Sequence, residues 1–331
     1  SYAGKAPYLS EDVRPGSTGT KSLLLKSTAV KIFGITVAIA NGTITTGRLN
    51  AGSTTATDAA NHAEMDLSKT DKDPSGHPFY SLLNAQPDSI VTWVKFKQQS
   101  VNSQYPYATI SATITDGTYY QEPVDKTYTN IVGRAENNQI ASNGAIWQRL
   151  TVPFSYTQYD NTKAIMVTMS TNNGAGTGKE GDELYVDDVE LVYNADITSV
   201  AVDGNNVTAT EYTGEEVPEY AKMFTAEIEV SKEITADDFV VETNAKQPLV
   251  SVEVVDTDDF NDFNIANNAD QVAVVTCFAA DLSKATKWLV FVEKNRKQGD
   301  VNSDGKVDIS DVTALIDIIL GKDNVKPYAY D

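Results

Sequence analysis

The sequence predicts an all-β protein: a jelly-roll β-sandwich, then a smaller immunoglobulin-like β-sandwich, then a short C-terminal loop and helix. Short runs of alternating polar and apolar residues recur between clusters of Gly, Asn, Asp and Pro, as in antiparallel sandwiches. No helical pattern of ordinary length occurs before about residue 200, whereas one follows an acidic loop near the end. We therefore expect domains at residues 1–194, 195–298 and 299–331.

The first domain contains the clearest strand patterns. They lie at residues 89–96, 108–114, 147–154, 164–169 and 184–193. Trp93 and Trp147 stand inside two of these runs, and we expect both rings to be core residues.

The second domain repeats the pattern on a smaller scale. Strand-like runs lie at residues 197–202, 226–230, 249–255, 272–278 and 288–292. Cys277, the single cysteine, stands in an apolar run and is expected to be a buried strand residue. Sandwiches of this size commonly act as spacers.

The C-terminal loop has the spacing of a twelve-residue calcium loop. Oxygen-bearing side chains occupy positions 1, 3, 5, 9 and 12, and Gly305 at position 6 permits the sharp turn. The expected Ca²⁺ ligands are Asp300, Asn302, Asp304, the Lys306 carbonyl, Asp308 and Asp311. An apolar stripe follows at helical spacing, and Gly321 is expected to end the helix.

Residues 299–321 resemble a dockerin repeat, with Asp311 where EF-hands usually carry Glu. Dockerins usually pair two such repeats and dock onto a cohesin. This chain has one repeat, because the acidic stretch at 256–261 lacks the glycine of position 6. The resemblance implies a calcium-ordered helical appendix and leaves docking to a protein partner open.

Composition limits the partners. The net charge of -20 argues against nucleic acid and against anionic membrane surfaces. No segment is long and apolar enough to span a bilayer. Thr- and Asn-rich strands with 16 tyrosines are typical of an extracellular β protein.

Two segments of the first domain form a recognisable pair: Arg14-Pro-Gly-Ser-Thr-Gly and Asp182-Glu-Leu-Tyr-Val-Asp-Asp-Val-Glu-Leu. They resemble the first and last strands of galactose-binding-like jelly rolls. With residues 33–48 between them, the domain is similar to the carbohydrate metabolism domain of gut Bacteroidetes surface proteins. The resemblance implies a glycan-related function outside the cell, at the cell surface or in the periplasm. In one version of this expectation, a lipid anchors the protein before it is processed.

Jelly rolls of this kind often hold a structural calcium near the terminal strands. The resemblance implies candidate ligands at Glu11, Asp12, Asp187 and Asp188. Because neighbouring strand residues point to opposite faces, we expect Asp187 and Asp188 not to share one site.

Sugar binding requires flat aromatic rings and planar polar groups. The candidates in or near loops are Tyr80, Tyr105, Tyr107, Tyr119, Tyr120 and Arg134. The competing interpretation is that half or more of these rings fill the core.

No catalytic motif is complete. Residues 174–179 lack the first glycine and the final Ser or Thr of a phosphate loop, and read as a turn. Two histidines and one cysteine cannot build a zinc cage. A glycosidase needs two carboxylates about 5–10 Å apart, and the candidates are Glu64, Asp66, Glu122 and Glu136.

The sequence therefore favours a non-catalytic, cell-surface protein that binds a glycan or polysaccharide. One alternative is a glycoside hydrolase that uses a carboxylate pair in the first domain. A second is a structural adhesin or assembly protein.

Overall fold

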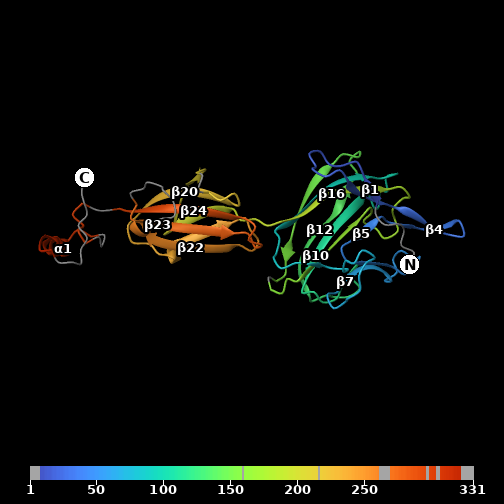
Figure 1. The fold of residues 1–331 in the computed structure, drawn as a ribbon, viewed down its shortest axis with the longest axis horizontal. Coiled ribbons are helices and arrows are strands. Elements are labelled where there is room, and N and C mark those ends of the chain that lie inside the picture. Colours follow the sequence, from blue (N-terminus) through green and yellow to red (C-terminus); the bar gives the residue numbers. More distant parts are fainter. Residues whose placement is uncertain are drawn as a thin grey trace. The chain divides into compact units, whose positions relative to one another are not determined.

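The computed structural model describes residues 8–158, 160–214, 217–260, 269–295, 298–302 and 306–321. The chain divides into two compact units, Ser1–Tyr193 and Asn194–Asp331. Both are built from β-strands, and the described part of the chain has one α-helix, near its end (Figure 1). The expected all-β fold with a short C-terminal helix is confirmed.

The first unit is a jelly roll. Its front sheet has the order β1 (Tyr8–Ser10), β2 (Ser22–Lys26), β16 (Glu183–Val192), β9 (Ser89–Lys97), β13 (Gln148–Pro153). Its back sheet has the order β14 (Ser155–Tyr156), β12 (Ile131–Ala141), β10 (Tyr107–Thr115), β15 (Ala164–Ser170), β5 (Thr43–Thr45). The short β8 (Ser81–Leu82) also pairs with β15. The last strand of the unit, β16, pairs in the front sheet with β2 from near the start of the chain, as in jelly rolls.

The main core fills the space between these two sheets. Alternate residues of β9 and β10 point into this core, and the outward-facing residues between them are mostly buried as well. The buried set includes Ile90, Val94, Phe96, Ile110, Ala112 and Ile114.

A smaller sheet packs on the outer face of the back sheet. It has the order β11 (Tyr120–Glu122), β7 (Asn61–Met65), β6 (Arg48–Ala51). Met65 and Tyr120 pack there against Met166 of β15 and form a second buried cluster. A separate hairpin, β3 (Thr28–Ile32) and β4 (Ile35–Ala40), completes the unit.

The second unit has two sheets. One joins β18 (Asn205–Asn206), β17 (Ile197–Val202) and β21 (Phe239–Thr243). The other has the order β19 (Ala209–Tyr212), β20 (Ala221–Val230), β24 (Ala285–Lys294), β23 (Gln271–Phe278), β22 (Leu249–Asp256). Strands β20 and β24 run parallel, which the local pattern does not predict. Two 3₁₀ turns, η1 (Ala236–Asp238) and η2 (Thr257–Asp259), lie in the connections.

Cys277 is buried in β23, as expected. The helix α1 (Ile309–Ile319) begins where Asp308 caps its N-terminus by accepting a 2.8 Å hydrogen bond from the Ser310 amide. Gly321 follows the helix at φ 64°, a conformation that glycine tolerates. The expected C-terminal helix is therefore present.

Candidate functional site

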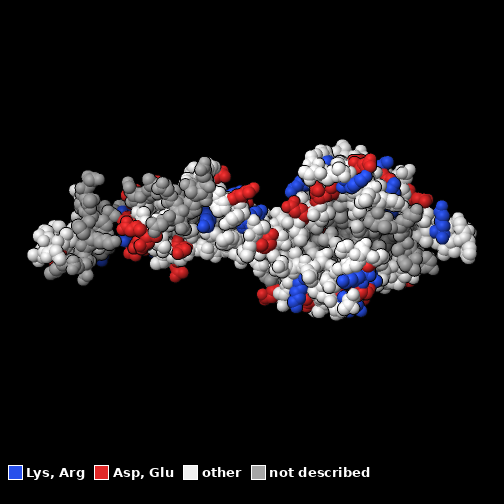
Figure 2. All heavy atoms as spheres, viewed as in Figure 1, with Lys and Arg blue, Asp and Glu red and all other residues white. Residues whose placement is uncertain are grey.

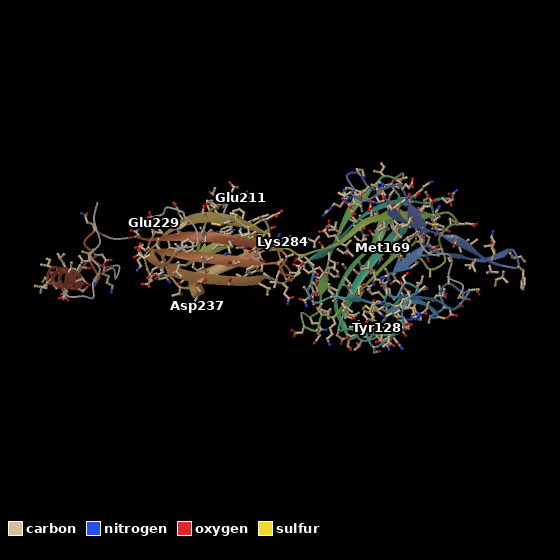
Figure 3. The ribbon with its side chains drawn as sticks, in the orientation of Figure 1. Tyr128, Met169, Glu211, Glu229, Asp237 and Lys284 are labelled. Atoms are coloured by element: carbon tan, nitrogen blue, oxygen red, sulfur yellow. The ribbon has the colours of Figure 1, made fainter. Side chains whose placement is uncertain are left out.

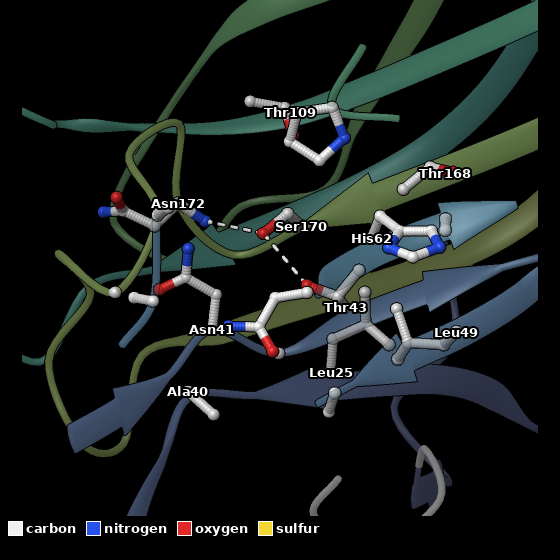
Figure 4. A pocket seen from close by; sticks show the side chains of 18 of the residues that line it. Leu25, Ala40, Asn41, Thr43, Leu49, His62, Thr109, Thr168, Ser170 and Asn172 are labelled. Atoms are coloured by element: carbon white, nitrogen blue, oxygen red, sulfur yellow. Dashed lines mark hydrogen bonds between the residues drawn. The ribbon is translucent and has the colours of Figure 1, made fainter. Parts of the chain in front are cut away.

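A groove of about 580 Å³ lies on the outer face of the back sheet in the first unit. Its floor comes from β5, β10, β12 and β15, and its walls come from the β3–β4 hairpin, the small sheet and residues 172–176. Figure 4 shows side chains from these separate elements facing one another across it.

Hydroxyl side chains cover the floor. Because Ile110 and Ala112 point into the core, Thr109 and Ser111 of β10 point outward. Residues from β5 and β15 continue this surface, where Thr43 donates a 3.3 Å hydrogen bond to the Ser170 hydroxyl (Figure 4). The result is a floor of short polar side chains.

Amide side chains fix the end of the groove. Asn172 donates from Nδ2 to the Tyr105 carbonyl at 3.0 Å and accepts from the Gly174 amide at 2.9 Å. Asn41 donates to the Gly174 carbonyl at 2.8 Å. At Gly176, where φ is 67°, an added Cβ would lie 2.4 Å from the Ala56 Cβ. Segment 174–179 is therefore a turn, as expected, and it is held in place from both sides.

An ion-pair network lies at another part of the groove. The Arg134 guanidinium donates from Nη2 to Glu122 Oε1 at 2.6 Å, and its Nε lies 2.9 Å from Glu136 Oε2. Ser111 donates to Glu122 Oε2 at 2.7 Å. Burial is the largest single influence on the pKa of Arg134 and lowers it, but Glu122, Tyr120 and Glu136 together outweigh burial, and the net shift is upward. Arg134 therefore remains charged and paired.

His62 lines the same groove from β7. Its Nδ1 lies 2.9 Å from the Ala59 carbonyl, which can only accept, so Nδ1 carries a proton. Its Nε2 lies 3.1 Å from Asn50 Nδ2 and 3.3 Å from Glu64 Oε2. These three contacts orient the imidazole at the wall of the groove.

The sugar-site candidates do not gather at the groove, with one exception. Arg134 lines it, whereas Tyr120 is fully buried beneath the small sheet. Tyr120 therefore serves the core and cannot stack on a sugar. Tyr80 packs against the same buried cluster. Tyr119 is half-buried near Tyr128, and burial together with Glu64 raises the pKa of Tyr119 to about 12.

Tyr105 and Tyr107 are partly exposed beside the start of β10. Tyr105 contributes to the groove through its backbone carbonyl, which holds Asn172. The Tyr105 ring lies beside Gly174, where an added Cβ would meet it at 2.6 Å. Neither Tyr105 nor Tyr107 lines the groove.

The expectation that Trp93 and Trp147 are core residues is wrong. Trp93 lies on the outer face of the front sheet, where Arg14 stacks 5.4 Å from its ring centroid. Trp147 donates from Nε1 to Asp12 at 3.1 Å and lies beside Lys95. The alternation of Trp93 with Lys95 on β9 is the signal that places this ring outside.

The candidates for a second metal site are bonded to nitrogen donors instead. Glu11 pairs with Lys21 at 2.7 Å, and Asp12 pairs with Lys95. The hydrogen bond from Lys95 lowers the pKa of Asp12. Among the described residues no cluster of three or more His, Cys, Asp or Glu side chains could hold a metal ion.

Asp187 and Asp188 contact different groups of the same residue. Arg14 donates its backbone amide to Asp187 at 3.0 Å and its Nε to Asp188 at 2.5 Å. The register of β16 shifts between Asp187 and Glu190, and Asp188 has φ 46°. This β-bulge breaks the regular alternation, and it leaves buried Asp187 on the Arg14 backbone and exposed Asp188 on the Arg14 guanidinium.

The C-terminal loop is organised around Asp311. Its Oδ1 accepts from the Val301 and Asn302 amides at 2.7 and 3.2 Å, and its Oδ2 accepts from the Asp308 amide at 2.7 Å. The Asp308 amide is the largest cause of the lowered pKa of Asp311. Asp300 is buried, Lys306 is exposed, and Asp304 lies outside the described residues.

Two of the carboxylates suggested for catalysis, Glu122 and Glu136, contact the same Arg134 guanidinium, and the other two lie elsewhere. Glu122 is the one carboxylate among the described residues that line the groove. Glu64 pairs with Arg48 on the small sheet at 3.6 Å, and Glu136 bonds Arg134 from outside the lining. Asp66 accepts from the Ser68 amide in a turn at 2.9 Å.

Comparisons with known proteins give no family for this chain: no protein-family model matches it, and no curated protein matches it. Within the described ranges, none of the helical residues form a segment with the length and apolar character needed to cross a membrane.

Proposed function

We propose that this protein binds a glycan in the groove of its first unit and takes part in polysaccharide capture or metabolism outside the cytoplasm. The observation that carries the proposal is the groove floor of hydroxyl and amide side chains on the back sheet. Hydroxyl and amide groups both donate and accept hydrogen bonds, as sugar hydroxyls require. The resemblance of the terminal strands to carbohydrate-related jelly rolls supports the same function.

The lining favours binding over hydrolysis. Glycosidases of the usual type place two carboxyl groups across the scissile bond. Glu122 supplies the one carboxylate among the described lining residues, and it already accepts hydrogen bonds from Arg134 and Ser111. A recognition site needs no such pair.

The C-terminal loop is proposed as a Ca²⁺ site. Its described side-chain oxygens, from Asp300, Asn302, Asp308 and Asp311, are the hard donors that Ca²⁺ prefers. Bound calcium supplies charge that holds the two halves of the loop together. Asp311 already joins these halves through its amide contacts, so ordering of α1 is the role that fits.

The function is tested by screening the purified chain against immobilised polysaccharides and measuring affinity for any that bind. We expect saturable binding to at least one polysaccharide, and the same binding after chelation of calcium with EGTA. Absence of binding across a broad panel would contradict the proposal. Loss of binding with EGTA would show that the glycan binds at a calcium-dependent site outside the groove.

A further inference from the structure

The charged groups that line the groove neutralise one another. Lys26 lies 2.8 Å from Glu183, and Arg134 lies within hydrogen-bond distance of Glu122. Among the described lining residues the charged side chains are Lys26, Glu122 and Arg134, apart from the imidazole of His62, and Glu183 reaches Lys26 from outside the lining. The groove therefore offers no unpaired carboxylate and no unpaired ammonium or guanidinium group in its described part.

Ligand charge follows from this pairing. A uronate or a sulfated sugar would have to compete with Glu122 for Arg134, and an amino sugar would have to compete with Arg134 for Glu122. The overall charge of -20 further disfavours polyanions. On the face of the first unit that Figure 2 shows, most basic side chains lie next to acidic ones, and no broad basic patch is visible there.

The β3–β4 hairpin supplies an apolar wall. Thr28 pairs with Ala40 and Val30 pairs with Ala38, and these two pairs line the groove. Ile32 pairs with Ile35 beyond a register shift between Val30 and Lys31, and neither of these isoleucines lines the groove. A mostly apolar strip therefore faces the ligand space beside the hydroxyl floor.

A pyranose ring has the matching surfaces: a rim of hydroxyl groups and faces of C–H groups. We propose that the groove selects uncharged glycans, an inference that rests on the proposed function. The sugar hydroxyl groups would contact the floor between Thr109 and Ser170, and the C–H faces would contact the wall formed by Val30 and Ala38. Selectivity against acidic glycans then comes from the Glu122–Arg134 pair. Glu136 contacts Arg134 Nε from outside the lining, and Glu122 occupies Nη2 on the groove side, which an acidic sugar would need.

The charge selectivity is tested with Glu122→Gln. Binding is measured by isothermal titration calorimetry with neutral probes (laminarin, galactomannan, xyloglucan) and acidic probes (polygalacturonate, alginate, chondroitin sulfate). We expect the unmodified protein to bind a neutral probe and no acidic probe. Glu122→Gln should raise affinity for acidic probes about tenfold. Glu229→Gln, a matched charge change on β20 of the second unit (Figure 3), should leave binding unchanged.

The role of the apolar wall in glycan binding is tested with the variant Val30→Asp, and Thr36→Asp is its control. Thr36 lies on the same hairpin, is exposed and does not line the groove, so it receives the same charge outside the site. We expect Val30→Asp to weaken neutral-glycan binding at least tenfold and Thr36→Asp to change it less than twofold. Circular dichroism on both variants confirms that the hairpin substitution leaves the fold intact.

The outcomes separate the two proposals. Preferential binding of an acidic probe by the unmodified protein would overturn the inference of neutral selectivity and leave glycan binding standing. Equal affinities of Val30→Asp and Thr36→Asp for the neutral probe would overturn the inference that the hairpin wall contacts the glycan. Binding of no probe would contradict the proposed function itself.

Discussion

Glu122 and Arg134 are joined by a 2.6 Å contact between Oε1 and Nη2 on the outer face of the jelly-roll back sheet. The pair connects β11 of the small sheet to β12 of the back sheet. Its carboxylate also receives the Ser111 hydroxyl from β10. One ion pair therefore ties three strands together and sets the charge of the groove.

Removing the cation of this pair should destabilise the first unit. The Arg134 and Glu122 side chains are 30% and 17% exposed, so Arg134→Gln leaves a largely buried carboxylate without its strongest partner. We expect the free energy of unfolding to fall by about 2 kcal/mol, measured by urea denaturation. Lys21→Gln, at an exposed pair with Glu11, should cost at most about 0.5 kcal/mol. Equal losses would contradict this ranking.

Tyr120 should affect stability rather than binding. Its side chain is fully buried with Met65 and Met166, so Tyr120→Ala opens a cavity beneath the small sheet. We expect a loss of about 3–5 kcal/mol in the free energy of unfolding. Tyr120→Phe removes only the hydroxyl, which makes 3.4 Å contacts with Thr113 and Arg134, and should cost about 1 kcal/mol. Normal stability of Tyr120→Ala would show that the cluster is not packed as described.

Tyr119 should make stability depend on alkaline pH. Burial and the nearby Glu64 carboxylate raise its pKa from 10.0 to about 12 in the folded protein. Between these values the unfolded chain loses the proton while the folded chain keeps it, so this contribution is complete below pH 10 and is lost toward pH 12.

The measurement is the urea midpoint at several pH values in this window. Tyr119→Phe should show a shallower decline than the unmodified protein. Tyr220→Phe, at a ring that is 60% exposed in the second unit, serves as the control and should keep the original slope. Identical slopes in all three proteins would refute the role of Tyr119.

Calcium should order the C-terminal loop. We expect calorimetric titration with CaCl₂ to show one tight site, and helical circular dichroism to increase on binding. Asp311→Asn removes a charged ligand and should weaken binding at least tenfold. Asp317→Asn, which lies beyond the loop on α1, should bind normally. Unchanged affinity in Asp311→Asn would argue against the proposed ligand set.

Strand positions in both units could be predicted because burial imposes a period of two. The strand β12 escaped prediction because Arg134, Glu136 and Asn138 alternate with small residues, so its buried side carries few large apolar groups. The C-terminal helix was predictable from its apolar stripe, although the stripe residues on the described helix are exposed.

The groove could not be predicted from local patterns. Its floor combines hydroxyl residues of strands that are far apart in sequence, and a strand bearing Thr109 and Ser111 reads as an ordinary solvent face. Aromatic residues are the usual sequence signal for a sugar site. In this protein Tyr120 lies in the buried cluster beneath the small sheet, and Trp93 lies on the front sheet. The bulge at Asp187 and Asp188 was equally hidden, because a register shift depends on partner strands.

The most direct test of glycan recognition in the groove is the affinity of Thr109→Tyr for a polysaccharide that the unmodified protein binds. Thr109 is half-buried on the floor, so a tyrosine ring there fills the ligand space. Thr210→Tyr makes the same change on exposed β19. We predict that Thr109→Tyr loses at least tenfold in affinity while Thr210→Tyr keeps it. Full affinity in a folded Thr109→Tyr protein would show that the glycan binds elsewhere.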